Sequence, residues 1–351
     1  MKFYLYLGVL LSILVSCKTA SVTNLDTLPS YAIEEVKRIS LSRDMEIESI
    51  DKSGRFYVAL DSRNHQYALV TFTDDGLVRD RYDRKGKGPG EFGPGDIFYI
   101  GAEGDRVYLG DREVNKIMAF EISPEGKIAF QDEFNLGEGR IIAAALGGDG
   151  LIYCSVIDGP AFLHVYDKKG ALLGRFVPAE HPDFASMTKQ ELMDYVARSI
   201  FIPLVSDEGV LLFGFLGKRL LFTQWDKAAL RVISEQEYPE FKGEWFEGEG
   251  RHGEEDNELS LRFSPSGTVA FFTRQGAYWI LIGSAEARDK AVLLSYNSRG
   301  ELLATARHRF RAGVTSPVLL YCASDDTLIY QETPLDEENR NHSEIVVCAF
   351  Q

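Results

Sequence analysis

Short apolar runs separated by turns recur along almost the whole chain. Six stretches share one layout, in which a turn containing Gly or Asp leads into an apolar run: SGRFYVALD (53–61), EGDRVYLGD (103–111), GDGLIYCSV (148–156), DEGVLLFGF (207–215), SGTVAFF (266–272) and DDTLIYQE (325–332). A second apolar run follows each of them, and a further turn and a third run follow the first five. Short runs rich in Val, Ile, Leu, Phe and Tyr and bounded by turn residues are typical of β-strands.

Adding the run that precedes each opening turn gives four strands per unit, in units of about 50 residues, which is the size of a propeller blade. The sequence therefore predicts an all-β fold, a six-bladed β-propeller. The sixth unit ends at Gln351 after its third strand, and a fourth strand is available at 31–41, YAIEEVKRISL. We predict that this N-terminal strand completes the last blade, because closing the ring removes an exposed sheet edge.

The innermost strand of each blade is expected at IESID (47–51), IFYI (97–100), IIAAAL (141–146), FIPLV (201–205), LSLRF (259–263) and PVLLY (317–321). These segments offer Glu48, Asp51 and Arg262 and otherwise mainly apolar residues. That is a poor ring of hard ligands, so we expect no metal site of the kind that gluconolactonase- and paraoxonase-like propellers hold.

The N-terminus has the features of a secretory signal. Lys2 precedes an uncharged, mostly apolar run that is too short to span a bilayer, and the run ends in LVSC at Cys17. This ending resembles the lipobox of bacterial lipoproteins, which implies cleavage before Cys17 and its acylation; an ordinary secretory signal with a chance cysteine is the alternative. We therefore predict a signal peptide at 1–16, a lipidated tether at 17–30 and the propeller at 31–351.

Two long connections interrupt the blade rhythm. Residues 181–200 carry a capping box at Thr188–Glu191 and then apolar residues four apart, which predicts one short helical insertion between blades 3 and 4. We interpret it as a lid packed on one face, with substrate gating as the alternative. Residues 238–258 mix Trp245 and Phe246 with several carboxylates. Such a run is usually a solvated loop; binding of a sugar or a cationic peptide, or of calcium, are the alternatives.

The stretch 83–96, DRKGKGPGEFGPGD, is the most unusual part of the sequence. It contains a G-x-G-x-x-G pattern, but a strand follows where a dinucleotide-binding fold needs a helix, and the Gly-Lys-Ser/Thr ending of a P-loop is absent. Free N–H groups beside Arg84, Lys85 and Lys87 could form an anion nest. Alternatively, the glycines let the backbone pass close under its neighbours.

GKGPGEF (86–92), the lipobox-like Cys17 and the six blades together resemble the NHL- or TolB-like six-bladed propeller lipoproteins of Gram-negative gut bacteria. The resemblance implies an extracytoplasmic propeller in the cell envelope and no established reaction. Residues 18–21 (KTAS) lack the acidic cluster associated with surface export in such bacteria. The periplasmic side and the outer-membrane surface therefore both stay open.

The composition of the chain limits which classes of partner and ligand we expect. The formal net charge is −15, from 38 Lys and Arg against 53 Asp and Glu, and such an acidic chain repels nucleic acid. Six histidines and four cysteines are too few and too scattered to predict a metal or cofactor site. Cys154, Cys322 and Cys348 each lie inside an apolar run, which favours buried thiols; a Cys322–Cys348 disulfide is the alternative.

No nucleophile elbow or Ser/His/Asp set is present, so we predict no catalytic residue. The favoured function is a membrane-anchored binding or scaffold protein for a glycan, a peptide or an envelope protein; the alternative is a lactonase- or lyase-like hydrolase with its site at the central channel. If the two insertions share a face with the glycine-rich stretch, the candidate ligand-binding residues are Arg84, Lys85, Lys87, Glu91, Trp245 and Phe246.

Overall fold

The computed structural model is built from β-strands, and its described part contains no α-helix. It describes residues 23–24, 27–41, 45–63, 66–137, 139–157, 163–176, 201–206, 209–214, 219–225, 230–237, 241–242, 271–283, 290–310, 319–322, 326–332 and 344–351. The predicted signal peptide, Cys17 and the predicted helical insertion at 181–200 lie outside these residues.

The first four blades are separate four-stranded antiparallel sheets whose strands lie side by side in chain order. Blade 1 holds β3 (Ile47–Ser53), β4 (Phe56–Asp61), β5 (Ala68–Phe72) and β6 (Val78–Tyr82); blade 2 holds β7 (Ile97–Glu103), β8 (Arg106–Asp111), β9 (Lys116–Ile122) and β10 (Ile128–Asn135). Blade 3 holds β11 (Arg140–Leu146), β12 (Ile152–Ile157), β13 (Leu163–Tyr166) and β14 (Leu172–Phe176); blade 4 holds β15 (Phe201–Ser206), β16 (Gly209–Gly214), β17 (Arg219–Trp225) and β18 (Leu230–Glu237).

The last two blades are joined into one eight-stranded sheet. Blade 5 holds β20 (Phe271–Arg274), β21 (Ala277–Gly283), β22 (Lys290–Tyr296) and β23 (Leu302–Arg309); blade 6 holds β24 (Leu319–Cys322), β25 (Thr327–Glu332), β26 (Glu344–Phe350) and the N-terminal strand β2 (Ser30–Ser40). β2 pairs antiparallel with β26 from Ile33↔Phe350 to Ser40↔Glu344. The predicted closure of the last blade by the N-terminal strand is therefore confirmed.

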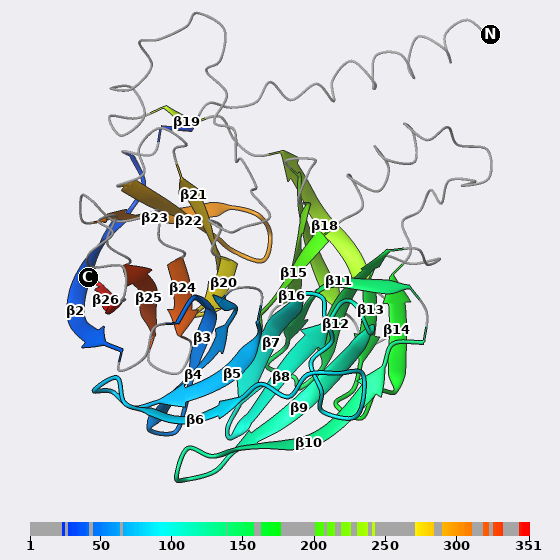
Figure 1. Ribbon diagram of the computed structural model, residues 1–351. Coiled ribbons are helices and arrows are strands. Elements are labelled where there is room, and N and C mark those ends of the chain that lie inside the picture. Colours follow the sequence, from blue (N-terminus) through cyan, green and yellow to red (C-terminus); the bar gives the residue numbers. More distant parts are fainter. Residues whose placement is uncertain are drawn as a thin grey trace, which may run out of the picture.

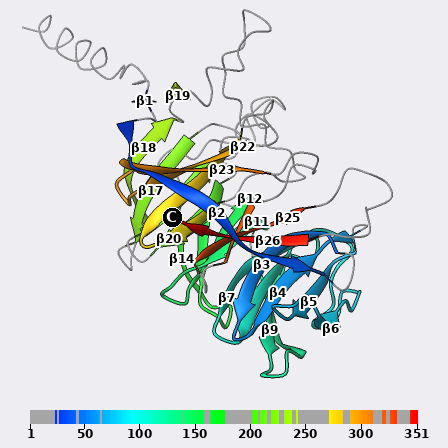
Figure 2. The same ribbon diagram turned by 90° about the vertical axis from the view of Figure 1, so that its left-hand side faces the viewer.

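The first strand of every blade lies at the centre of the ring. β3 contacts β7, β7 contacts β11, and the series continues through β15, β20 and β24, which returns to β3. Figure 1 shows the blades arranged around this centre, and Figure 2 shows β2 next to β26 on the side that faces the viewer. A short parallel pair outside the blades, which the sequence pattern did not predict, joins β1 (Thr23–Asn24) to β19 (Phe241–Lys242).

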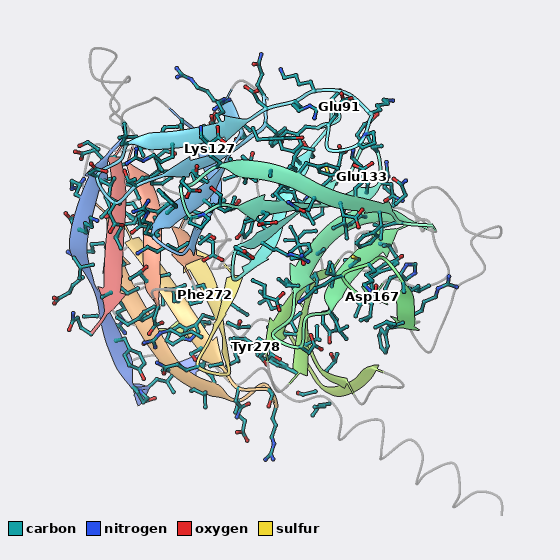
Figure 3. All side chains as sticks on the ribbon, turned by 90° about the horizontal axis from the view of Figure 1, so that it is seen from below. Glu91, Lys127, Glu133, Asp167, Phe272 and Tyr278 are labelled. Carbon is teal, nitrogen blue, oxygen red and sulfur yellow. The ribbon has the colours of Figure 1, made fainter. Side chains whose placement is uncertain are left out.

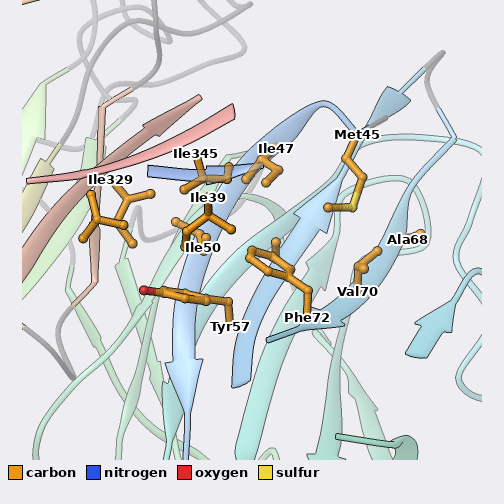
Figure 4. Close-up of a cluster of buried hydrophobic side chains, with 12 residues drawn as sticks. Ile39, Met45, Ile47, Ile50, Tyr57, Ala68, Val70, Phe72, Ile329 and Ile345 are labelled. Atoms are coloured by element: carbon orange, nitrogen blue, oxygen red, sulfur yellow. The ribbon is translucent and has the colours of Figure 1, made fainter. Parts of the chain in front are cut away.

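Apolar side chains fill the space between neighbouring blades. The cluster in Figure 4 joins the closing blade to blade 1, and Ile39 of β2, Ile345 of β26 and Phe72 of β5 all contribute to it. Each of these three side chains is at most 2% exposed. Burying an aliphatic or aromatic side chain contributes roughly 1.5–3 kcal/mol, so blade packing holds the ring together.

One turn recurs between the third and fourth strands of blades 1, 2, 3 and 5. A Thr, Ser, Asp or Asn carbonyl accepts the N–H of a glycine three residues later. The glycines have φ between 81° and 83°, a left-handed conformation that only glycine adopts readily; they are Gly76, Gly126, Gly170 and Gly300. These glycines belong to the turns from which the repeat was predicted.

Blade 5 corrects the predicted strand positions. The run 266–272 was predicted as its second strand, but the structure places β20 (Phe271–Arg274) as the first strand and β21 (Ala277–Gly283) as the second. The turn between them contains Gln275 at φ 51° and Gly276 at φ 77°. Gln is an uncommon residue at positive φ, so this hairpin could not be predicted from its turn residues. The predicted inner strand at 259–263 lies outside the described residues.

Candidate functional site

The glycine-rich connection (83–96) crosses from β6, the outermost strand of blade 1, to β7, the innermost strand of blade 2. Its backbone folds back on itself, and Gly86 N donates to Phe92 O at 2.9 Å. The Phe92 ring is buried against the rings of Tyr82 and Phe120, with centroid distances of 5.7 and 5.9 Å. Phe92 thereby fixes the connection to the core between blades 1 and 2.

Three glycine N–H groups of this connection donate to carboxylates of the protein itself. The pairs are Gly88 with Glu91 (3.0 Å), Gly90 with Glu133 (3.0 Å) and Gly93 with Asp111 (2.8 Å). An anion nest needs converging N–H groups that have no acceptor of their own. These three N–H groups are therefore not available to an anion nest, and their hydrogen bonds favour the other interpretation, a close backbone crossing that needs glycine.

A buried lysine, Lys116, binds the glycine-rich connection to blade 2. Lys116, at the start of β9, has 1% of its side chain exposed and forms an ion pair with Glu133 of β10 at 2.8 Å. The Lys116 Nζ also donates to Gly88 O at 3.0 Å, and the same Glu133 oxygen accepts the Gly90 N–H. One ion pair thus attaches blade 2 to two points of the connection. Figure 3 labels Glu91 and Glu133 on this part of the molecule.

The structure places four of the predicted ligand-binding residues. Arg84, Lys85 and Lys87 are exposed on the glycine-rich connection, and Arg84 lies 3.9 Å from the carboxylate of Glu91. Glu91 accepts the Gly88 N–H within the same connection. Trp245 and Phe246 lie outside the described residues, as does most of the segment 238–258 that was expected to frame the site. Their juxtaposition with the basic residues stays a prediction.

A second polar group lies beside the end of the connection, where β3 and β7 begin. The Tyr67 hydroxyl donates to Asp96 Oδ1 at 3.3 Å, and Arg112 Nη1 contacts Asp96 Oδ2 at 3.2 Å. The Arg112 guanidinium also lies 4.7 Å from the centre of the Phe98 ring and donates from Nε to Ile142 O, at 2.7 Å. Arg112 therefore bridges the inner strands of blades 2 and 3.

Glu48 completes this group from the innermost strand of blade 1. Glu48 is exposed, yet partial desolvation by the surrounding protein raises the pKa of its carboxyl; the carboxylates of Asp96 and Glu46 raise it further, against the opposing effects of the Ser62 hydroxyl and Arg112. Burial and the charges of Glu48 and Asp96 likewise raise the pKa of the Tyr67 hydroxyl. Shifted carboxyl and hydroxyl groups of this kind gather at functional sites. The sequence singled out Glu48 alone, because the other members come from separate loops.

Strand direction places these features on one face of the ring. In each four-stranded antiparallel blade the fourth strand ends at the edge where the first strand begins, so the connections between blades meet at that face. The glycine-rich connection and Glu48 belong to it. β14 ends and β15 begins at this face, and in the same way β18 ends and β20 begins there. The chain therefore enters and leaves the two long connections predicted at 181–200 and 238–258 at this face. The turns between third and fourth strands lie on the opposite face.

Neither of the two cysteines whose side chains the structure describes, Cys154 and Cys348, offers a reactive thiol. Cys154 lies directly opposite His164 across β12 and β13, a pairing that the sequence did not predict. The Cys154 thiol is completely buried, however, and burial raises its pKa, so it is a poor nucleophile. Cys348 is also a free thiol. β25 separates it from Cys322, a distance of about two strand spacings or ~9.5 Å, which is too far for the alternative disulfide.

In the part of the chain that the structure describes, no group of three or more His, Cys, Asp and Glu side chains is arranged to hold a metal ion. The described residues likewise include no helix that is long and apolar enough to cross a membrane.

Residues 32–210 match the family described as a 6-bladed beta-propeller, which is just over half of the chain. This protein belongs to that family. No curated protein matches the sequence. The family assignment agrees with the predicted fold; the narrower likeness to NHL- and TolB-like lipoproteins stays a prediction.

Several solved structures are similar to this chain at low sequence identity, and the first of those described here shares its fold. A protein of Bacteroides fragilis, assigned as exported, is 11% identical with a TM-score of 0.54, over 92% of this chain and 99% of that one. A Lactobacillus plantarum protein is 10% identical with a TM-score of 0.46, over 94% and 89% of the two chains. A Bacteroides caccae protein of unknown function is 12% identical with a TM-score of 0.41, over 77% and 89%.

Proposed function

We propose that this protein is an extracytoplasmic binding protein, anchored to a membrane through acylated Cys17, that recognises a glycan, a peptide or an envelope protein. The observation that carries the proposal is the gathering, on one face, of exposed basic side chains and of groups whose pKa values are shifted. There the glycine-rich connection exposes Arg84, Lys85 and Lys87, and Glu48 and Tyr67 have shifted pKa values. Rigid blades hold these groups in place, as a preorganised binding site requires.

Three observations support the location and the kind of function. The lipobox-like end of the apolar N-terminal run supports a lipid anchor at Cys17. The fold shared with a protein assigned as exported is in keeping with a place outside the cytoplasm. The chain also lacks a recognisable catalytic motif, which favours binding over catalysis.

The test is a glycan and peptide array probed with soluble protein that begins at residue 18. Ligands found this way are then measured with Lys85→Ala/Lys87→Ala and with Trp245→Ala, and each is expected to weaken binding about tenfold or more, which corresponds to roughly 1.4 kcal/mol. The matched control is Lys127→Ala, since Lys127 is also exposed but lies in the turn before β10 on the opposite face. Equal binding by all variants would overturn this choice of face.

A further inference from the structure

The N-terminal strand β2 passes from one blade to the next at a single point. Residues Ser30 to Ala32 pair in parallel with β23 of blade 5, and the last of these pairs is Ala32↔Arg307. From Ile33 onward β2 pairs antiparallel with β26 of blade 6 instead. The backbone at Ala32 and Ile33 is therefore the fork at which blades 5 and 6 are joined.

His308 occupies this fork. It follows Arg307 on β23, is 6% exposed, and its Nδ1 lies 3.1 Å from Ile33 O. A carbonyl oxygen only accepts, so Nδ1 carries the hydrogen and Nε2 of the neutral ring carries a lone pair. The ring packs between Phe310 and Tyr330, with centroid distances of 4.9 and 5.3 Å. The His308 side chain thus binds β2 where β2 leaves β23.

Protonation of His308 would place a second N–H at Nε2, and no described residue accepts a hydrogen bond at that position. Its Nε2 is buried without a hydrogen-bond partner. Burial lowers the pKa of His308; the hydrogen bond to Ile33 and the carboxylates of Glu332 and Glu35 oppose this, but the net direction is downward. The neutral ring is therefore the form that the closed fork favours.

The other titratable groups around the fork either form ion pairs or are buried in their neutral form. Glu332 on β25 is buried and pairs with Arg38 on β2, which also binds Glu35 at 2.7 Å and Glu344 at 2.9 Å. The Tyr330 hydroxyl and the Cys348 thiol, on β25 and β26, both have raised pKa values, chiefly through burial, and stay neutral. The other oxygen of Glu332, Oε1, has no hydrogen-bond partner, and it does not bind His308 Nε2, which has none either.

We propose that His308 is an acid-sensitive latch, which holds the N-terminal strand at the junction of blades 5 and 6 when neutral and releases it when protonated. Because the folded-state pKa lies below the usual value, the effect is absent above about pH 6.5 and grows as the pH falls through and below that value. β2 directly follows the predicted tether, so the latch would link acidity to the end of the propeller nearest the anchor.

Hydrogen–deuterium exchange of the full chain tests the latch at pH 7.5 and pH 5.5, after correction for intrinsic exchange rates. Peptides covering β2 and β23 are compared with the peptide covering β8 and β9 in blade 2. If the opened fork has a His308 pKa near 6.5, protection of the β2 amides should fall about tenfold relative to the reference at pH 5.5. In His308→Asn, whose amide donates a hydrogen bond but does not titrate, that relative fall should disappear.

A relative change of less than twofold in the wild-type protein would overturn the latch, as would an unchanged fall in His308→Asn. Increased protection of β2 at pH 5.5 would also overturn it, since it would mean that Glu332 accepts the new proton and strengthens the fork. His308→Gln serves if the Asn variant does not fold. If neither variant folds, the wild-type comparison decides: a fall confined to β2 and β23 supports the latch, and a fall shared with blade 2 refutes it.

Discussion

Replacing Lys116 should destabilise the propeller far more than replacing an exposed lysine in the same blade. In Lys116→Met the apolar part of the side chain is kept, but the Glu133 carboxylate loses its charged partner and Gly88 O loses a donor. Breaking a buried ion pair by removing one partner costs about 3–5 kcal/mol. Glu133 is 19% exposed, so water offsets part of this cost, and we expect Lys116→Met to lower the free energy of unfolding by about 3 kcal/mol.

The matched control is Lys127→Met. Lys127 also forms an ion pair, with Asp80 at 3.7 Å, but 67% of its side chain is exposed. Exposed pairs contribute about 0–1 kcal/mol, so this variant should stay close to wild type. Urea unfolding followed by circular dichroism gives both values, from the midpoint shift at constant slope.

The double variant Lys116→Met/Glu133→Leu separates the pair from its packing. With both charges gone no unpaired ion is left under the connection, and such replacements are often neutral. We therefore expect its free energy of unfolding to lie within about 1–2 kcal/mol of wild type, above that of Lys116→Met. The reasoning is refuted if Lys116→Met and Lys127→Met lower the free energy of unfolding by the same amount. It is also refuted if the double variant is less stable than wild type by the sum of the effects of Lys116→Met alone and Glu133→Leu alone.

Three further predictions concern closure, anchoring and a glycine. Deleting residues 18–29 should leave the thermal midpoint nearly unchanged, whereas deleting 18–42 should unfold or aggregate the protein by exposing the edge of β26; equal midpoints would contradict the role of β2. Cys17→Ser should move the protein from membranes to the soluble fraction, and a carbonate-resistant mutant would disprove the lipid anchor. Gly90→Ala should lower the free energy of unfolding in urea by about 1–3 kcal/mol more than Gly54→Ala. Both glycines have positive φ, but only a Cβ at Gly90 would meet a side chain, at 2.6 Å. Equal losses of stability would argue against the close crossing.

Sequence alone predicted most of the architecture, because the signals for it are local. Each turn glycine, such as Gly126, stands where a left-handed conformation is needed, and the apolar runs between turns have the length of strands. Counting strands then predicted a pairing between residues about 310 positions apart, which Ile33↔Phe350 confirms. The prediction failed in blade 5, where Gln275 takes a left-handed conformation that is uncommon for glutamine.

The chemistry of the candidate site was decided by tertiary structure. The sequence left an anion nest open as the alternative to a close crossing at 83–96, and only the structure shows that Glu133 and Asp111, from blade 2, accept two of the glycine N–H groups. Similarly, nothing in the sequence connects His308 with Ile33. Hydrogen bonds between such distant residues depend on how blades pack, and the periodic pattern that specifies blades carries no information about which polar side chains meet across them.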